Sequence, residues 1–244
     1  MDQTIAALSL RQKSGTQTAC RSCPVRGFAL FGALDDSMVE WTQNWRSAQW
    51  LANPGTLIYR EGQPLDESWS LQSGWVAFFK HLPDGRRQIM RFGLPGDFLG
   101  YFGDDTRTPN HGLLALDHCV LCAFPRHRLK ELFVRRPELA LRLMQMQTRD
   151  MAHCADHIAS IGRQNARQRV ATLLLHLFDR MELRGAVSGG SMAFPLSQED
   201  IADYTGMTVV HVNRTLNALR REKLIDYGRG LLTLPDPGAL ARDM

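Results

Sequence analysis

One short stretch, residues 196–225, limits most strongly what this chain can fold into. It reads LSQEDIADYTGMTVVHVNRTLNALRREKLI. Ser197 followed three residues later by Asp200 is a capping-box pattern, which begins a helix. Gly206 provides a sharp bend, and Thr208 can cap a second helix. The stretch therefore predicts a helix-turn-helix, with an ordinary helical hairpin as the alternative.

The second predicted helix has two different faces. Its apolar side repeats at helical spacing, through Val209, Val212, Leu216 and Leu219. Its other side carries arginine, asparagine and histidine, which can reach base edges in a major groove. A helix that is apolar behind and polar in front is what a recognition helix needs. We therefore expect this helix to read DNA.

A hairpin and several cations follow the recognition helix. LIDYGRGLLTL, residues 224–234, holds two β-prone runs around Gly228-Arg229-Gly230, which predicts the wing of a winged helix-turn-helix. Cations here can bind phosphates, which adds affinity rather than specificity, or they can form a solvated face. The residues predicted to contact double-stranded DNA are Ser197, Thr208, Val210, His211, Asn213, Arg214, Asn217, Arg220, Arg221, Lys223 and Arg229.

The preceding segment, residues 34–125, is punctuated by glycine and proline. Short β-prone runs such as TLIYR, WVAFFK, QIMRF and VLCAF lie between these breaks, and Asp84-Gly85 predicts a hairpin. Many short strands with turn signals indicate a barrel, roll or sandwich. Residues 1–33 form a polar lead-in, and SGGSM at 188–192 is expected to be a loop.

A long helix is predicted from Pro137 to about Gly162. Leu139, Leu143 and Met146 can pack on the β-domain. A second stripe has coiled-coil spacing and is predicted to form a parallel dimer, through Met144, Gln147, Met151, Cys154, Ile158 and Ile161. The alternative is a core helix of a monomer. We thus expect an α+β chain with a lead-in at 1–33, a sensor domain at 34–125, a dimerisation helix at 126–162 and a DNA-binding domain at 163–244.

Composition narrows the class of protein. The 244 residues are 44% hydrophobic and 22% charged, which is typical of a globular chain. No run approaches the roughly 20 apolar residues of a membrane span, and the N-terminus does not resemble a secretory signal. We therefore expect a cytoplasmic protein. No P-loop, Gly-x-Ser-x-Gly or His-Glu-x-x-His motif is present, so we do not expect an enzyme.

The order of these parts resembles the CRP/FNR family of bacterial transcription regulators. The motifs that carry the resemblance are SGWVAFFKHLPDGRRQIMRFGLPGDFLG, residues 73–100, and the helix-turn-helix, within a similarity that spans about residues 20–235. The resemblance implies an N-terminal β-roll of the cyclic-nucleotide-binding type, a long dimer helix and a C-terminal winged helix-turn-helix. It also implies a homodimer that binds palindromic promoter sites and contacts RNA polymerase, usually as an activator. A nucleotide-binding module of an enzyme or channel is the rival outside this class, and the helix-turn-helix argues against it.

The resemblance also indicates which effectors to consider, and the first is a cyclic nucleotide. Cyclic-nucleotide-binding members carry a Gly-Glu pair and a later arginine after the Pro-Gly-Asp turn. Here that stretch is GYFGDDTRTPNHG, where Asp104 and Asp105 would repel a phosphate and Arg107 lacks the usual neighbours. We therefore do not expect control by cyclic AMP.

The alternative is a sensor of oxygen or nitrogen oxides that uses an iron–sulfur cluster or a haem. Cys20, Cys23 and Cys122 match three of the four cluster ligands of FNR-like members. The fourth would stand where this chain has Ala29 or Phe31, and Cys119 is a substitute that should face the other side of its strand. Among haem-binding members no short motif marks the ligands, so His81, His111 and His118 stay open.

Two further details concern the long helix and the recognition helix. His153 and His157 are four residues apart on the long helix, a spacing that can bind metal but that also suits solvated or interface histidines. In the recognition helix the family's glutamate is replaced by Val210, while Arg214 is kept and resembles the guanine reader. Valine can contact only a thymine methyl group, so the half-site should differ from the well-known consensus sites.

Overall fold

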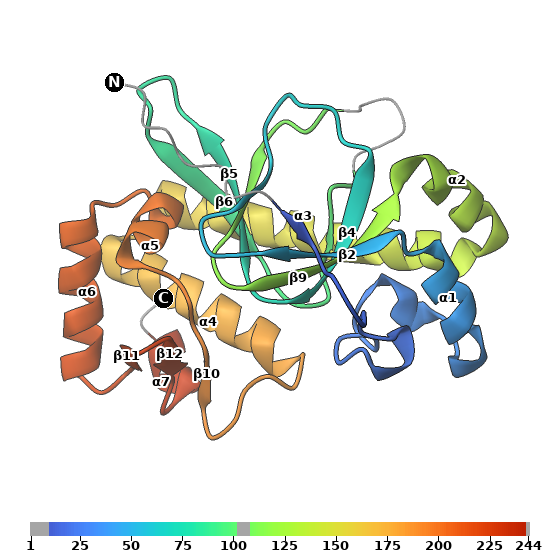
Figure 1. Cartoon of the computed structure of the whole chain (residues 1–244). Helices are drawn as coiled ribbons and strands as arrows, with labels where there is room; N and C mark the ends of the chain where they lie inside the picture. Colours follow the sequence, from blue (N-terminus) through green and yellow to red (C-terminus); the bar gives the residue numbers. More distant parts are fainter. Residues whose placement is uncertain (1–9, 102–107, 243–244) are drawn as a thin grey trace. The chain divides into compact units, whose positions relative to one another are not determined.

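The computed structural model describes residues 10–101 and 108–242, and these divide into two compact units. The described residues of the first unit lie within 10–80 and 91–150, and those of the second within 81–90 and 151–242. Figure 1 draws the helices and strands of both. The tip of one hairpin, residues 81–90, thus belongs with the C-terminal helices. No helix of the described residues is long and apolar enough to cross a membrane.

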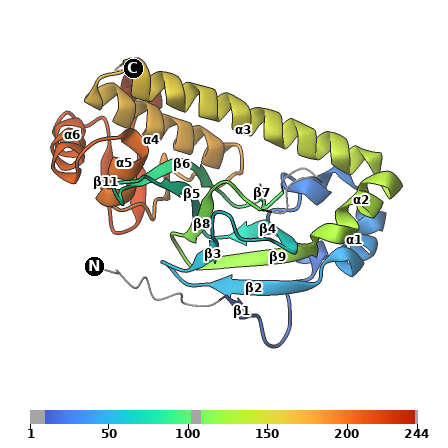
Figure 2. The same ribbon diagram turned by 90° about the horizontal axis from the view of Figure 1, so that it is seen from above.

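Two antiparallel sheets form the β-roll. Strands β2 (Ala48–Ala52), β9 (Cys119–Pro125) and β4 (Glu67–Ser73) lie at the centre of a five-stranded sheet, which β1 (Arg11–Gln12) and β7 (Phe98–Leu99) complete at its two edges (Figure 2). The four-stranded sheet has the order β3 (Leu57–Tyr59), β8 (Gly112–Ala115), β5 (Val76–His81) and β6 (Arg87–Gly93). The predicted hairpin joins β5 to β6, with Gly85 at a φ of 84° in the turn. The family resemblance therefore predicted the roll correctly.

The N-terminal lead-in is less polar in its packing than the sequence analysis expected. It contains the short 3₁₀ helices η1 (Cys20–Ser22) and η2 (Leu30–Ala33), and η3 (Asp36–Met38) with α1 (Val39–Trp45) follows. Leu30 and Phe31 are buried, and the rings of Phe31 and Phe124 lie 4.7 Å apart. The lead-in thus fills one end of the roll's core, because its few apolar residues pack together against β9 and the following helices.

Helices α2 (Arg126–Arg135) and α3 (Pro137–Arg163) follow the roll, and α3 is the long helix predicted from the sequence (Figure 2). Pro137 suits the first position of α3, where its missing N–H has no helical partner. Leu139 and Leu143 are buried in the same core as Leu30 and Phe31, and Met146 packs against that core. This stripe of α3 therefore packs as expected.

The second unit carries the C-terminal elements. Helix α4 (Ala166–Glu182) begins at a capping box made by Asn165 and Gln168. Beyond it lie α5 (Gln198–Thr205), α6 (Val209–Arg221), α7 (Pro237–Ala241) and a sheet of order β10 (Ser191–Ala193), β12 (Leu231–Thr233) and β11 (Asp226–Gly228). The expectation of a loop over 188–192 was therefore wrong at its end, because Met192 pairs with Leu232 and is buried.

Candidate nucleic-acid interface

Helix α5 begins as its sequence predicts. The Ser197 hydroxyl accepts from the Asp200 N–H at 3.1 Å, and the Asp200 carboxylate accepts from the Ser197 N–H at 3.0 Å. These two bonds satisfy backbone donors that the first turn of a helix otherwise leaves open. Asp200 is itself largely buried, and Ile201 and Ala202 turn inward beside it. Ser197 therefore acts as a structural cap in this unit.

The turn into α6 also follows the prediction. Gly206 ends α5 in the left-handed region at φ 68°, and the Thr208 hydroxyl accepts from the His211 N–H at 3.3 Å. Val212, Leu216 and Leu219 are buried, but Val209 is 44% exposed. The assignment of Val209 to the buried face was therefore wrong, because the core that buries the other three residues does not cover this first residue of α6.

The outer face of α6 is open to solvent. Val210, His211, Asn213, Arg214 and Asn217 are all exposed there. Within the part of the chain that the structure describes, the Arg214 guanidinium makes no hydrogen bond or ion pair. Its planar fork is thus available for the two acceptors of a guanine edge.

A hydrogen-bonded chain links the wing, α5 and α6. The Asn217 amide donates to Asn213 at 2.9 Å, and Asn213 donates to Gln198 at 3.1 Å. Gln198 in turn donates to the hydroxyl of Tyr227 in β11 at 2.9 Å. The sequence prediction omitted Gln198 and Tyr227, since only the pairing of distant elements brings them to this surface. Asn213 therefore has protein partners as well as a place on the exposed outer face of α6.

The cations of the interface differ in their surroundings. Arg220 pairs with Asp226 of β11 at 3.0 Å, although both side chains are more than half exposed. Arg221 is exposed near the end of α6, while Lys223 and Arg229 adopt positive φ angles of 60° and 52° in the turns that flank β11. Arg220 is thus partly committed to the wing, whereas the other three present their charge to solvent.

The stripe predicted to form the dimer is exposed on α3. Met144, Met151 and Ile158 are 60%, 74% and 72% exposed, which is unusual for large apolar side chains spaced along one face. Gln147, Cys154 and Ile161, which continue the same stripe, are partly exposed. This face is separate from the buried stripe of Leu139 and Leu143, so α3 has an apolar surface that its own core does not cover.

The histidines of α3 are not both solvated. His157 is 8% exposed, and its ring stacks on Tyr204 with 3.7 Å between the centroids. Burial lowers the pKa of His157 to about 4. The rings of His153 and His176 lie 4.0 Å apart. The interpretation of His157 as a solvated or interface residue was therefore wrong, because α5 covers its ring.

The N-terminal cysteines do not provide a four-thiolate site. Burial raises the pKa of the Cys20 and Cys23 thiols, and the charge of Arg46 opposes this effect at both. Cys122 interacts electrostatically with both, and its sulfur accepts from the Gln49 amide at 3.3 Å. In residues 10–101 and 108–242, no three His, Cys, Asp or Glu side chains are arranged to hold a metal ion.

The positions that could have supplied a fourth ligand are occupied by packing residues. Ala29 and Phe31 are 5% and 6% exposed, and their side chains offer no donor atom. The Cys119 thiol donates to the carbonyl oxygens of Trp75 and Asp117, and burial raises its pKa to about 12. Because a cluster normally needs four ligands, these residues do not fit one.

Several aromatic side chains pack together inside the roll. The Tyr59 hydroxyl and His111 Nε2 lie 2.8 Å apart, and the His111 ring lies 5.3 Å from that of Phe78. Arg91 stacks over Phe78 and pairs with Asp150 at 3.0 Å. Burial lowers the pKa of His111 to about 4. Asp104, Asp105 and Arg107, on which the nucleotide argument depended, lie outside the described residues.

The fold and this surface define a class: a β-roll joined by a long helix to a winged helix-turn-helix DNA-binding domain. Models of a cyclic nucleotide-binding domain and of a Crp-like helix-turn-helix domain match residues 51–136 and 168–243. The transcriptional activatory protein AadR of Rhodopseudomonas palustris is 34% identical over 83% of each chain, and the nitrogen fixation regulation protein FixK of Bradyrhizobium diazoefficiens is 31% identical over 89% of this chain and 90% of its own.

The structure of FixK2 from Bradyrhizobium japonicum superimposes with a TM-score of 0.72 at 30% identity, covering 80% of this chain and 96% of that one. The chain belongs to the CRP/FNR family of transcription regulators. It is a DNA-binding regulator and not an enzyme, as its sequence predicted.

Proposed function

We propose that this regulator is a cytoplasmic homodimer that activates transcription from palindromic promoter sites and contacts RNA polymerase there. The observation that supports this best is the exposed apolar stripe of α3. The same chain also presents the polar outer face of α6 to solvent. A dimer along α3 would supply two recognition helices, which two-fold-related half-sites require. Of the two relatives described above, AadR is named as a transcriptional activatory protein and FixK as a nitrogen fixation regulation protein.

The residues divide into readers and anchors. Arg214 would bind guanine O6 and N7, and Val210 would pack on a thymine methyl group. His211, Asn213 and Asn217 lie on the same exposed face, with Thr208 at its start. Arg221, Lys223 and Arg229 would bind phosphates, and Arg220 would join them from its pair with Asp226.

Selection of bound sequences from a randomised DNA library tests the proposal. We expect recovered sites to be palindromes whose half-sites are about one helical turn apart, roughly 10 base pairs between centres, because two symmetric helices must face the same side of DNA. Recovery of isolated half-sites, or of DNA without sequence preference, would contradict the homodimeric mode of reading.

Cyclic AMP is not expected to control this protein. The inner arginine of the roll, Arg91, is already paired with Asp150, and its charge also acts on Tyr59 and His111. A buried phosphate would need that cation for itself. Addition of cyclic AMP should change neither the melting temperature nor the affinity for the selected DNA. A saturable calorimetric titration with micromolar affinity would show that the nucleotide does bind.

The proposal includes no iron–sulfur cluster. Sensing by a cluster or haem stays the second candidate for the signal, and it is favoured only by the gathering of Cys20, Cys23 and Cys122. Among residues 10–101 and 108–242, no further side chain is arranged with these thiols to complete a cluster, so we assign none to this chain.

A further inference from the structure

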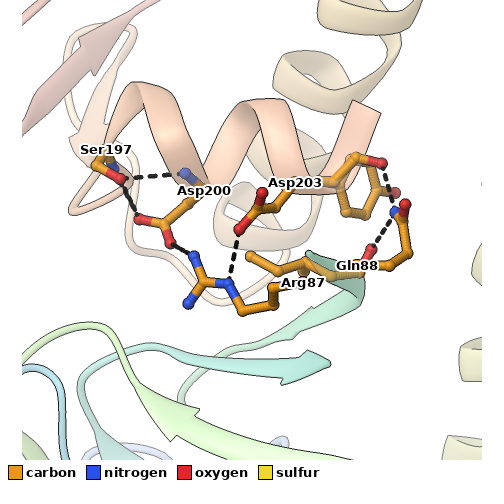
Figure 3. Close-up of polar contacts among 7 residues, drawn as sticks. Arg87, Gln88, Ser197, Asp200 and Asp203 are labelled. Carbon is orange, nitrogen blue, oxygen red and sulfur yellow. Dashed lines mark hydrogen bonds and ion pairs between the residues drawn. The ribbon is translucent and has the colours of Figure 1, made fainter. Parts of the chain in front are cut away.

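The tip of the β5–β6 hairpin contacts the first helix of the helix-turn-helix. Arg87 donates through Nε to Asp203 at 2.6 Å and through Nη2 to Asp200 at 2.9 Å (Figure 3). The three side chains are only 21%, 21% and 11% exposed, in the order Arg87, Asp203, Asp200. All three residues belong to the second compact unit. Because water is partly excluded, this pair of charge-assisted bonds is stronger than an ordinary surface ion pair.

The next two hairpin residues add neutral contacts. Gln88 donates to the backbone carbonyl of Tyr204 at 3.1 Å (Figure 3), and the His157 ring makes a hydrogen bond with the Ile89 backbone. His157 also stacks on the Tyr204 ring. Three consecutive hairpin residues therefore join the end of α5 to α3, and we call residues 87–89 with their partners the hairpin latch.

Asp200 has two tasks in this arrangement. One carboxylate oxygen completes the capping box with Ser197, and the other accepts from Arg87. Asp200 and Asp203 are three residues apart, so they are neighbours on one face of α5. Without Arg87, two close carboxylates would lose their shared cation, and α5 would lose its charged link to the hairpin.

We propose that Arg87 is a positioning residue for DNA recognition, holding α5, and with it α6, at a fixed orientation on the end of α3. This inference rests on the proposed function, in which a dimer along α3 reads two half-sites. The distance between two recognition helices depends on how firmly each helix-turn-helix is attached to α3. A firm attachment makes the dimer discriminate between half-site spacings, whereas a loose one tolerates several.

The test compares Arg87→Ala with Arg86→Ala, a matched control. Arg86 is the neighbouring arginine, with a side chain that is 78% exposed and that bonds, among the described residues, to Asp84 of its own turn. Dissociation constants are measured for the selected palindrome, for palindromes with one base pair added or removed, and for a single half-site. For Arg87→Ala we expect about tenfold weaker binding to the best palindrome and a preference for the best spacing reduced about tenfold.

The single half-site separates positioning from folding. Its affinity should change less than twofold in Arg87→Ala, because the reading face of α6 is intact. Asp203→Asn, which leaves the capping box in place, should act in the same direction, and the double variant should lose less than the sum of the two. Equal losses on half-site and palindrome, or spacing preferences like those of Arg86→Ala, would overturn the proposal.

A measurement without DNA tests whether the hairpin latch holds α5, even if the protein does not bind palindromes. Amide hydrogen exchange in α5 should be faster in Arg87→Ala than in Arg86→Ala, since local opening costs less once the latch is gone. Unchanged exchange in α5 would refute the latch, whereas faster exchange in a protein that prefers no spacing would refute only the homodimeric function.

Discussion

Replacement of Arg214 by alanine is expected to weaken binding by about 1–3 kcal/mol per half-site and to flatten the preference at one base pair. Arg214 is exposed on the reading face of α6 and has no protein partner among the described residues. Its loss therefore removes a base contact without disturbing the fold. Since a dimer uses the residue twice, this is the largest effect that we expect from one substitution on this surface.

Arg221→Ala is the matched comparison for Arg214→Ala. Arg221 lies two turns further along α6, where a cation faces the DNA backbone rather than base edges in our proposal. Its removal should weaken all sequences about equally and lower the salt slope by about one per subunit. Binding to a randomised half-site library at two salt concentrations measures both effects. A changed base preference in Arg221→Ala, with none in Arg214→Ala, would show that the register assigned to α6 is wrong.

Met151→Lys and Ile158→Lys are expected to convert the protein into monomers. Both side chains are more than 70% exposed in the single chain, and in a dimer along α3 each would be buried near its symmetry partner. An unpaired lysine there is costly to bury. Binding to the palindrome should then fall to the level of a single half-site.

Light scattering of the purified variants gives the oligomeric state directly. Leu183→Lys is a suitable control, because Leu183 is 84% exposed at the end of α4 and lies off the stripe. Dimers that persist in both lysine variants of α3 would mean that the stripe is not the interface.

Local signals in the sequence were enough for the helix-turn-helix. Ser197, Gly206 and Thr208 each act within a few residues of their own position, so cap and turn chemistry predicted α5 and α6 closely. The long helix α3 could be predicted equally well, since its two apolar stripes repeat along a single element. Two predictions made from local sequence were wrong. Val209 is exposed rather than buried, and part of the glycine-containing segment at 188–192 pairs as β10.

The hairpin latch could not be predicted in this way. Arg87 and Asp200 are 113 residues apart, and LPDGRRQ reads equally well with either arginine in solvent. Adjacent residues near a turn point in different directions, but which one meets α5 depends on how distant elements pack. The cysteines are a different case, because the sequence alone already shows Ala29 and Phe31 where a fourth ligand would stand, and the structure adds that both are buried.

The hydrogen-bonded chain from Asn217 through Asn213 and Gln198 to Tyr227 has a consequence for how target preference can evolve. If Asn213 reads bases as proposed, a substitution there alters base contacts and also removes the hydrogen bond to Gln198, which itself bonds to Tyr227 of the wing. Regulators that diverge from this one should therefore acquire new binding sites through coupled replacements at these positions, and single exchanges at Asn213 should be poor starting points for engineering altered promoters.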